Sequence, residues 1–328
     1  MAADVVQVIV AEPSTDTSAF IFTRLLRSIE SSGRSCQIWM PDQATITEAS
    51  PWRPLLETGN IRSRIHPSPA LVLLNTARDW LAYHQLYQGQ ARSPVMQLFG
   101  GSDLRHWGHA SQRHPAVRVG LGAEITAGLS SQGIYREPLH TLPFGLDPSE
   151  LPALPAEQSN QKVLILAKHQ PALGLLLQQQ LDAAGLDCQV ELMPWPRDRM
   201  LQAMAVAATV VILAPPEGEA SLGQRRLSAM ALQAAVVSQS RSGLDALCQE
   251  GRNALVRPAE PKAITEAVLS LHGRSSTALR RRLVDGGIAT ALRHGSARQE
   301  LEFQLLLDRL PQLWQEACNC HSVVETSA

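Results

Sequence analysis

The turn between a short apolar run and a helical pattern holds the side chains of this sequence that are best suited to chemistry on an anionic substrate. The turn contains two carboxylates and a small-residue segment, and the helical pattern after it begins with two cations: Glu217, Glu219, Ser221, Leu222, Gly223, then Arg225 and Arg226. A helix N-terminus offers unpaired N–H groups and a partial positive charge, so a turn that leads into a helix can hold a phosphate. Glu217 or Glu219 could accept hydrogen bonds from hydroxyl groups of a ligand. Arg225 and Arg226 are adjacent, so at most one of them faces such a site.

Apolar runs and helical patterns alternate on both sides of this turn. The runs are Val210–Ala214, Val236–Val237 and Leu255–Val256, and a helical pattern with Leu227 and Met230 on one face separates the first two. This alternation is typical of a parallel sheet covered by helices. Ligands of such sheets bind at the carboxyl ends of the strands. The sequence therefore predicts a nucleotide-phosphate site in this stretch.

Composition limits the class of protein. The 328 residues suffice for two domains, and 29 basic against 30 acidic residues argue against a nucleic-acid binder. Five scattered cysteines favour a reducing compartment over a disulfide scaffold. Cys318, Cys320 and His321 lack a second ligand pair, so we expect no metal there. No signal peptide or membrane-spanning run is found, and we expect a cytoplasmic protein, with a peripheral membrane contact left open.

The pattern of the rest of the chain predicts two α/β stretches in which strands and helices alternate. We expect an N-terminal Rossmann-like domain over residues 1–150, a proline-rich linker over 151–161 and a second Rossmann-like domain over 162–300. A terminal helix over 301–318 would pack across both domains, with a tail over 319–328. From Thr277 onward the pattern is helical, and we expect breaks at Gly286–Gly287 and at Gly295. The last helix is expected as one amphipathic segment from Glu300 to Ala317.

Four segments, in order, resemble motifs of the GT-B glycosyltransferases, above all the large retaining family that uses nucleotide sugars (group 1, or family 4 type). Leu142–Asp147 resembles the I-P-N-G-V-D that ends the first domain of the family, and Glu217–Val237 resembles its E-G-[small]-G-x-x-x-x-E-A-M-A-x-G-x-P-V-V. Gly243–Asp245 and Glu250–Pro258 resemble the downstream G-x-x-E-x-x-x-x-G-x-N-G-x-L-V-x-P. The resemblance implies a GT-B fold, with two Rossmann-like domains that face a cleft.

The resemblance also implies a glycosyltransferase that uses a nucleotide-sugar cosubstrate, retains the anomeric configuration and needs no metal or other cofactor. Lys168 matches a cation that binds the donor diphosphate, and Arg225 or Arg226 could supply a second one. Ser228 falls where the family has the glutamate that holds the ribose, and a serine cannot chelate a diol as a carboxylate does. The partners implied are a nucleotide-diphosphate sugar and a glycan, lipid-linked or small-molecule acceptor.

Asp103 and His106 follow a predicted strand end of the first domain and could act on the acceptor, since histidine titrates near neutrality. A retaining enzyme of this type does not need a dedicated base, because the leaving phosphate can take the acceptor proton. Two other interpretations stay open. Ser228 and a missing arginine favour a non-catalytic GT-B protein that binds a partner or sugar, and Asp16 with Asp103 would suit a GT-B nucleotide-sugar epimerase.

Overall fold

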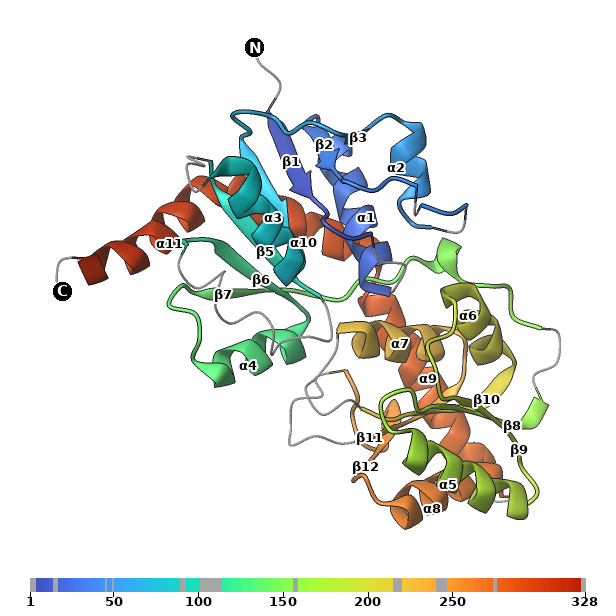
Figure 1. The fold of residues 1–328 in the computed structure, drawn as a ribbon. Coiled ribbons are helices and arrows are strands. Elements are labelled where there is room, and N and C mark those ends of the chain that lie inside the picture. The colour runs from blue at the N-terminus through green and yellow to red at the C-terminus, as the bar shows by residue number, and fades with distance from the viewer. Residues whose placement is uncertain are drawn as a thin grey trace. The chain divides into compact units, whose positions relative to one another are not determined.

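A computed structural model describes residues 4–13, 17–44, 46–48, 50–88, 93–100, 114–155, 159–214, 220–239, 247–273 and 276–325. The chain divides into two compact units (Figure 1). Unit 1 comprises Met1–Pro143 and Gln299–Ala328, and unit 2 comprises Phe144–Arg298.

Unit 1 is built on a seven-stranded sheet in the order β3-β2-β1-β4-β5-β6-β7, in which every neighbouring pair is parallel. Its elements are β1 (Val5–Ile9), α1 (Thr17–Ser31), β2 (Ser35–Trp39), α2 (Arg53–Glu57), β3 (Ile61–Arg62), β4 (Leu71–Leu74), α3 (Ala77–Tyr87), β5 (Val95–Phe99), β6 (Val117–Leu121), α4 (Ala123–Gln132) and β7 (Leu139–Leu142). Strands β4, β5 and β6 are buried at every position, as expected where helices cover both faces of a sheet. The strand order reverses between β1 and β4, which is the switch point of a Rossmann fold.

Unit 2 has a five-stranded parallel sheet in the order β12-β11-β10-β8-β9. Its elements are the 3-10 turn η3 (Pro148–Glu150), β8 (Ser159–Leu166), α5 (Pro171–Ala183), β9 (Asp187–Glu191), α6 (Arg197–Val206), β10 (Ala207–Ile212), α7 (Ala220–Ala231), β11 (Ala235–Gln239), β12 (Ala254–Arg257), α8 (Pro261–His272) and α9 (Thr277–Arg293). Helices α5 and α8 contact each other, as do α6 and α7. The order is that of flavodoxin-like sheets, and its switch point lies between β8 and β10.

The two parallel sheets confirm the predicted α/β class. Valine, isoleucine and leucine of β8, β10 and β11 form a buried core in unit 2 with α5, α8 and α9. In unit 1, a second core gathers around Val72, Leu74 and Trp80. Both cores arise from continuous apolar runs, the signature of strands buried on both faces.

The chain returns to unit 1 through α10 (Ser296–Asp308) and α11 (Leu310–Glu325). The prediction of one helix from Glu300 to Ala317 was wrong, because the segment forms two helices that are separated at Arg309, just ahead of Pro311. Proline lacks an N–H and is tolerated only in a first helical turn, so it favours the start of a new helix there. Residues 319–325, which were expected in a tail, belong to α11.

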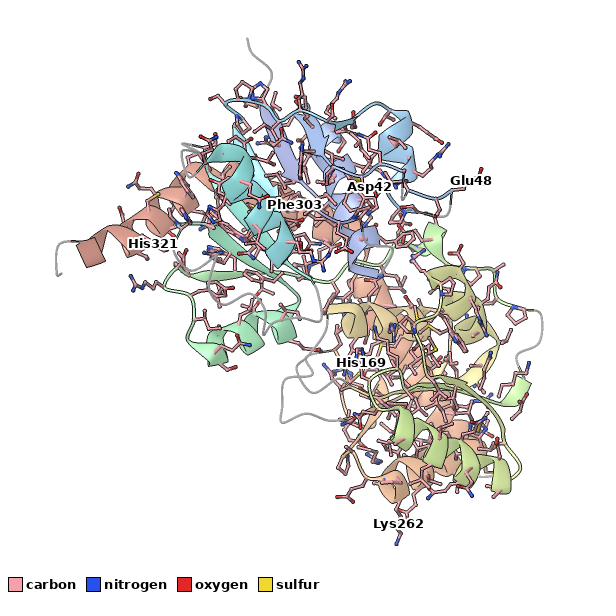
Figure 2. All side chains as sticks on the ribbon, viewed as in Figure 1. Asp42, Glu48, His169, Lys262, Phe303 and His321 are labelled. Carbon is pink, nitrogen blue, oxygen red and sulfur yellow. The ribbon has the colours of Figure 1, made fainter. Side chains whose placement is uncertain are left out.

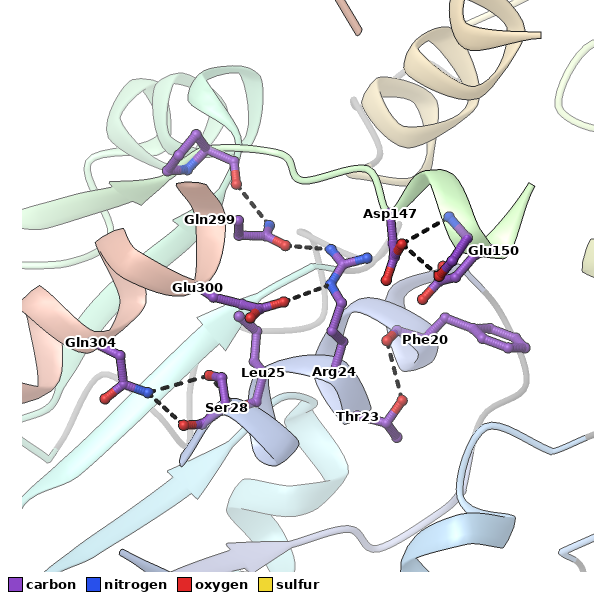
Figure 3. A network of polar contacts seen from close by, with 12 residues as sticks. Phe20, Thr23, Arg24, Leu25, Ser28, Asp147, Glu150, Gln299, Glu300 and Gln304 are labelled. Carbon is purple, nitrogen blue, oxygen red and sulfur yellow. Dashed lines mark hydrogen bonds and ion pairs between the residues drawn. The ribbon is translucent and has the colours of Figure 1, made fainter. Parts of the chain in front are cut away.

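Polar side chains fix α10 against α1 within unit 1 (Figure 3). Arg24 donates to the buried Gln299, whose amide nitrogen donates to the carbonyl of Pro143. The Gln304 amide donates to the carbonyl of Ser28 at 2.8 Å. Phe303 of the same helix is fully buried.

A buried ion pair lies beneath α11. The Arg118 guanidinium, which is 0% exposed, pairs with Glu137 at 3.1 Å and lies 4.6 Å from the ring centroid of Tyr135. Burial lowers the pKa of Arg118 and the Glu137 carboxylate opposes that shift. His321 of α11 hydrogen-bonds the same carboxylate at 2.9 Å, so the segment considered as a metal fragment instead helps to dock α11.

Helix α9 runs without a break through Gly286 and Gly287, so the break expected there was wrong. A Cβ at position 286 would lie 2.1 Å from the backbone oxygen of Arg252, and one at position 287 would lie 3.1 Å from the Met230 side chain. The two glycines therefore serve close packing of α9 against α7 and against the turn before β12. The break expected at Gly295 is confirmed, because α9 ends at Arg293 and α10 begins at Ser296.

Gly286→Ala should lower the free energy of unfolding of the protein by about 1–3 kcal/mol, because the new methyl group meets a backbone atom that cannot rotate away. Urea denaturation followed by circular dichroism measures this. Gly273→Ala is the matched control, since its Cβ would meet nothing closer than 3.9 Å. Equal stability of the two variants would contradict the packing role of Gly286.

Protonation of His114 should destabilise unit 1 as the pH falls below about 6.5, the ordinary pKa of histidine. The pKa of His114 is lowered by burial first and then by His84, His321 and Arg118. A lowered pKa in the folded state means that the unfolded chain binds the extra proton first, so acid favours unfolding. The pKa of Asp79, raised to about 6 by burial, acts in the opposite direction over the same range. Between pH 7.5 and pH 5.5, the urea midpoint of the wild type should therefore fall relative to that of His114→Gln, and identical changes in both proteins would exclude His114 as a source.

Candidate functional site

The switch point of unit 2 joins the ends of β8 and β10. Beyond β8, the amide of Gln170 donates to the carbonyl of Ala167 at 2.9 Å and closes a turn whose two central residues are Lys168 and His169. The start of this turn is fixed too, because the Ala167 amide donates to the carbonyl of Glu191 at 3.0 Å. Lys168, the predicted diphosphate cation, is thus half-buried on a short turn with a defined path (His169 is labelled in Figure 2).

Two glutamines connect the carboxyl ends of three central strands. The side-chain oxygen of Gln239, at the end of β11, accepts from the main-chain amide of Ala214 at 3.1 Å and from the side-chain nitrogen Nε2 of Gln170 at 2.6 Å. The same Gln170 nitrogen donates to the Ala214 carbonyl at 2.7 Å. The last described residue after β10 is thereby held by side chains on both of its main-chain groups.

Helix α7 begins directly after the candidate glutamates and is buried from Leu222 through Met230. Gly223 is required in its first turn, since a Cβ there would lie 2.1 Å from the ring of Phe144. Phe144 belongs to the segment expected to end the first domain, and here it packs on α7 within unit 2. The predicted site residues Leu222 and Gly223 thus lie in the first turn of a packed helix, and Ser221 comes just before them.

Two arginines of α7 are buried and take different partners. The Arg225 guanidinium forms a two-pronged contact with Glu191 at the end of β9, with N–O distances of 3.0 and 3.4 Å. The Arg226 side chain donates to the Ser238 hydroxyl of β11 at 3.1 Å. Neither arginine is a solvated surface residue.

Ser228 lies on the same helix and is 3% exposed. Its carbonyl accepts from the amide of Leu232 at 2.9 Å, within the last turn of α7. The position that resembles the ribose-binding glutamate of the GT-B family is therefore inside a packed helix.

Comparison with known proteins agrees with this geometry. A family model described as glycosyl transferases group 1 matches residues 149–274, which cover most of unit 2. The chain has the GT-B fold, and the group 1 glycosyltransferase model matches its second unit. Both the predicted resemblance and the predicted fold are thereby confirmed. A search of curated protein sequences finds no match.

Several solved structures share the GT-B fold of this chain. Sucrose-phosphate synthase from Thermosynechococcus elongatus is 11% identical with a TM-score of 0.66, over 94% of this chain and 99% of that one. HepE of Anabaena, solved with UDP and glucose, is 14% identical with a TM-score of 0.70, over 93% of this chain and 99% of that one. A glycosyltransferase from Rickettsia africae is 12% identical with a TM-score of 0.61, over 95% and 99% of the two chains.

The remaining predicted site residues of this GT-B chain lie outside the described residues. These are Glu217, Glu219, Asp103 and His106, together with Asp16. Their roles stay predictions, as do those of Lys168, Ser221, Leu222, Gly223, Arg225 and Ser228. Within the described ranges, no group of three or more His, Cys, Asp or Glu side chains could hold a metal ion. Among the same residues, we find no helix that is long and apolar enough to cross a membrane.

Sequence reasoning missed the partners that organise this edge of the sheet. Glu191 ends the alternating strand Asp187–Glu191 and is completely buried, although a lone carboxylate at a strand end looks like a surface residue. Gln170 and Gln239 carry no motif. A buried arginine needs a carboxylate partner, so two arginines in an otherwise apolar helix were the available signal.

Glu191→Gln should lower the free energy of unfolding by about 3–5 kcal/mol, because it leaves the buried Arg225 charge without its counter-ion. Chemical denaturation tests this, with Glu266→Gln as the control. Glu266 forms an exposed pair with Lys262, where loss of the carboxylate should cost less than about 1 kcal/mol. A small effect at both positions would mean that the Arg225 pair adds little to stability.

Proposed function

We propose that this protein is a glycosyltransferase that binds a nucleotide-diphosphate sugar on unit 2 and moves the sugar to an acceptor bound by unit 1. The observation that carries the proposal is the position of Lys168. It lies at the switch point of the sheet that matches the group 1 family model, on the turn Ala167–Gln170. Ligands of doubly wound sheets bind at that point.

The chemistry of sugar transfer fits this edge of the sheet. Cleavage of the donor places growing negative charge on the leaving diphosphate, and that charge needs fixed positive groups. Lys168 supplies a full charge, and the first turn of α7 supplies N–H groups that have no partner within the helix. Arg225 is a weaker candidate for a second cation, because Glu191 already balances its charge.

We further propose a retaining reaction without a metal or other cofactor. Lys168 and the α7 amides would take the role that a metal has elsewhere, and the leaving phosphate would take the acceptor proton. Glu217 or Glu219 would hydrogen-bond the donor sugar, and Asp103 and His106 would serve the acceptor side. The HepE complex with UDP and glucose supports a nucleotide-hexose donor. The acceptor class is a glycan, a lipid-linked sugar or a small molecule, and we place the reaction in the cytoplasm.

A specific observation favours a second candidate, a non-catalytic GT-B protein that binds a sugar or partner. Ser228 is buried in α7 where the family resemblance predicts a ribose-binding carboxylate, and Arg225 is neutralised by Glu191. Such a protein would bind a nucleotide weakly and would not hydrolyse the donor.

Lys168→Ala should weaken the binding of nucleotide diphosphates by roughly 10- to 100-fold, the value of a hydrogen bond to a charged group. Calorimetric titration with UDP, GDP, ADP and their glucose or mannose conjugates measures this. Lys162→Ala is the matched control, since Lys162 is exposed and lies in β8, the strand that leads to the Lys168 turn, before its apolar run. Equal losses in both variants would point to general electrostatics instead of a site at Lys168.

Donor hydrolysis separates the two candidates. A slow release of free sugar from one of the donors, abolished in Lys168→Ala, is expected for the enzyme. Nucleotide binding without hydrolysis in any donor would favour the non-catalytic protein. Failure of all nucleotides to bind or to raise the melting temperature would overturn both.

A further inference from the structure

We propose that Gln170 and Gln239 are positioning residues for donor binding, and that they act through Lys168 without touching the donor's phosphates themselves. We call these two side chains and the main chain of Ala214 the glutamine clamp. The inference rests on the proposed function, because it assigns a way of presenting Lys168 to the same site.

The glutamine clamp lies directly beyond the last main-chain hydrogen bond between β8 and β10. The last ladder-like contact between β8 and β10 is the bond from the Leu213 amide to the Leu166 carbonyl at 3.1 Å. One residue further, both main-chain groups of Ala214 are bonded to side chains: its amide to Gln239 and its carbonyl to Gln170. The three strands therefore remain connected beyond the last ladder bond.

Lys168 depends on that connection because of the turn that carries it. Only two residues separate Ala167 from Gln170, and the bond between them closes the turn at 2.9 Å. Ala167 is held by the carbonyl of Glu191, and it packs on Gly174 of α5, where a Cβ would lie 2.3 Å from the Ala167 methyl group. Among the described residues, the Gln170 side chain is what ties the far end of the turn to β10 and β11. Loss of the clamp would remove that tie and let Lys168 sample other directions.

A clamp of amides also suits the charge of the proposed ligand. Gln239 is 7% exposed and its side-chain oxygen accepts two hydrogen bonds without adding charge. A carboxylate at the same place could accept both bonds, but it would repel a diphosphate in a site of low dielectric constant. The clamp thus fixes the edge and leaves Lys168 as its cation.

The test is a double-mutant cycle between Gln239 and Lys168. The affinity of the nucleotide diphosphate that the wild type binds most tightly in the panel above is measured by calorimetry in wild type, Gln239→Ala, Lys168→Ala and the double variant. We expect Gln239→Ala to weaken binding about fivefold in the wild type and to have no further effect in the Lys168→Ala background, since it acts through that lysine. Equal effects in both backgrounds would overturn the inference.

Gln178→Ala is the matched control. Gln178 lies on α5, the helix that follows the clamp residue Gln170, and its side chain donates to the Cys188 carbonyl at 3.4 Å, near the start of β9. It should leave the affinity unchanged. An equal loss of affinity in Gln178→Ala and Gln239→Ala would show that any weakened helix contact has this effect, and would also overturn the inference.

A second variant guards against loss of folding. Gln239→Glu keeps the acceptor oxygen, so its melting temperature should stay close to that of the wild type, while its charge should weaken diphosphate binding about tenfold or more. Unchanged affinity in this variant would show that the clamp lies away from the diphosphate.

If the wild type binds no nucleotide, the proposed function itself fails and the clamp has no donor to position. If it binds and Gln239→Ala matches it, only the clamp inference fails.

Discussion

The burial of α7 on all sides is the constraint on which the rest of unit 2 depends. A helix in this position would ordinarily be apolar all round. This one carries Gln224, Arg225, Arg226 and Ser228 at buried positions. Buried charges and polar groups need counter-ions or hydrogen-bond partners, so the helix determines which residues must surround it. Glu191 at the end of β9 supplies the counter-ion of Arg225, and the Ser238 hydroxyl of β11 accepts a hydrogen bond from Arg226.

The same packing explains the small residues of unit 2. Because Gly223 has no Cβ, the ring of Phe144 can pack against it, and Gly287 allows the Met230 side chain of α7 to pack in the same way. Neighbouring Gly286 lets α9 approach the turn at Arg252, which Asn253 organises through its bond to Thr290. A single buried helix thus fixes the position of the segment that follows unit 1 and of the helix that leads back to it.

Much of the fold followed from patterns that physical chemistry makes strong. Parallel sheets covered by helices were predicted from the alternation of apolar runs with helical patterns, and the apolar run Val163–Leu166 is indeed a buried part of strand β8. The errors arose where one residue type has two roles. Gly286–Gly287 was interpreted as a helix break, although glycine also permits close helix packing, and only the neighbouring Arg252 and Met230 decide between the two. The partners Glu191, Gln170 and Gln239 are distant in sequence from the residues that they hold, so no local pattern could reveal them.

At the switch point of each unit, the loops after two neighbouring strands diverge, and the main-chain hydrogen bonds of the sheet no longer connect them. In unit 1, the carboxylate of Asp79 on α3 connects the two loops. It accepts from the amide of Ala11 after β1 at 2.8 Å, and from the amides of Asn75 and Thr76 after β4 at 3.1 and 2.7 Å. Burial raises the pKa of Asp79 to about 6, while its backbone bonds favour the charged form. In unit 2, the uncharged side-chain amides of Gln170 and Gln239 connect the strand ends.

The difference in charge between these two devices follows from what each edge is proposed to bind. A carboxylate that accepts three N–H groups holds its loops more strongly than a neutral amide does, because charge-assisted hydrogen bonds are the stronger ones. It also adds negative charge to its surroundings. That addition is unfavourable beside a diphosphate, whose charge increases as the donor is cleaved. Weaker, neutral bonds at the edge that carries Lys168 are therefore what a donor site requires, and a charged clamp at that edge would work against the cation that it positions.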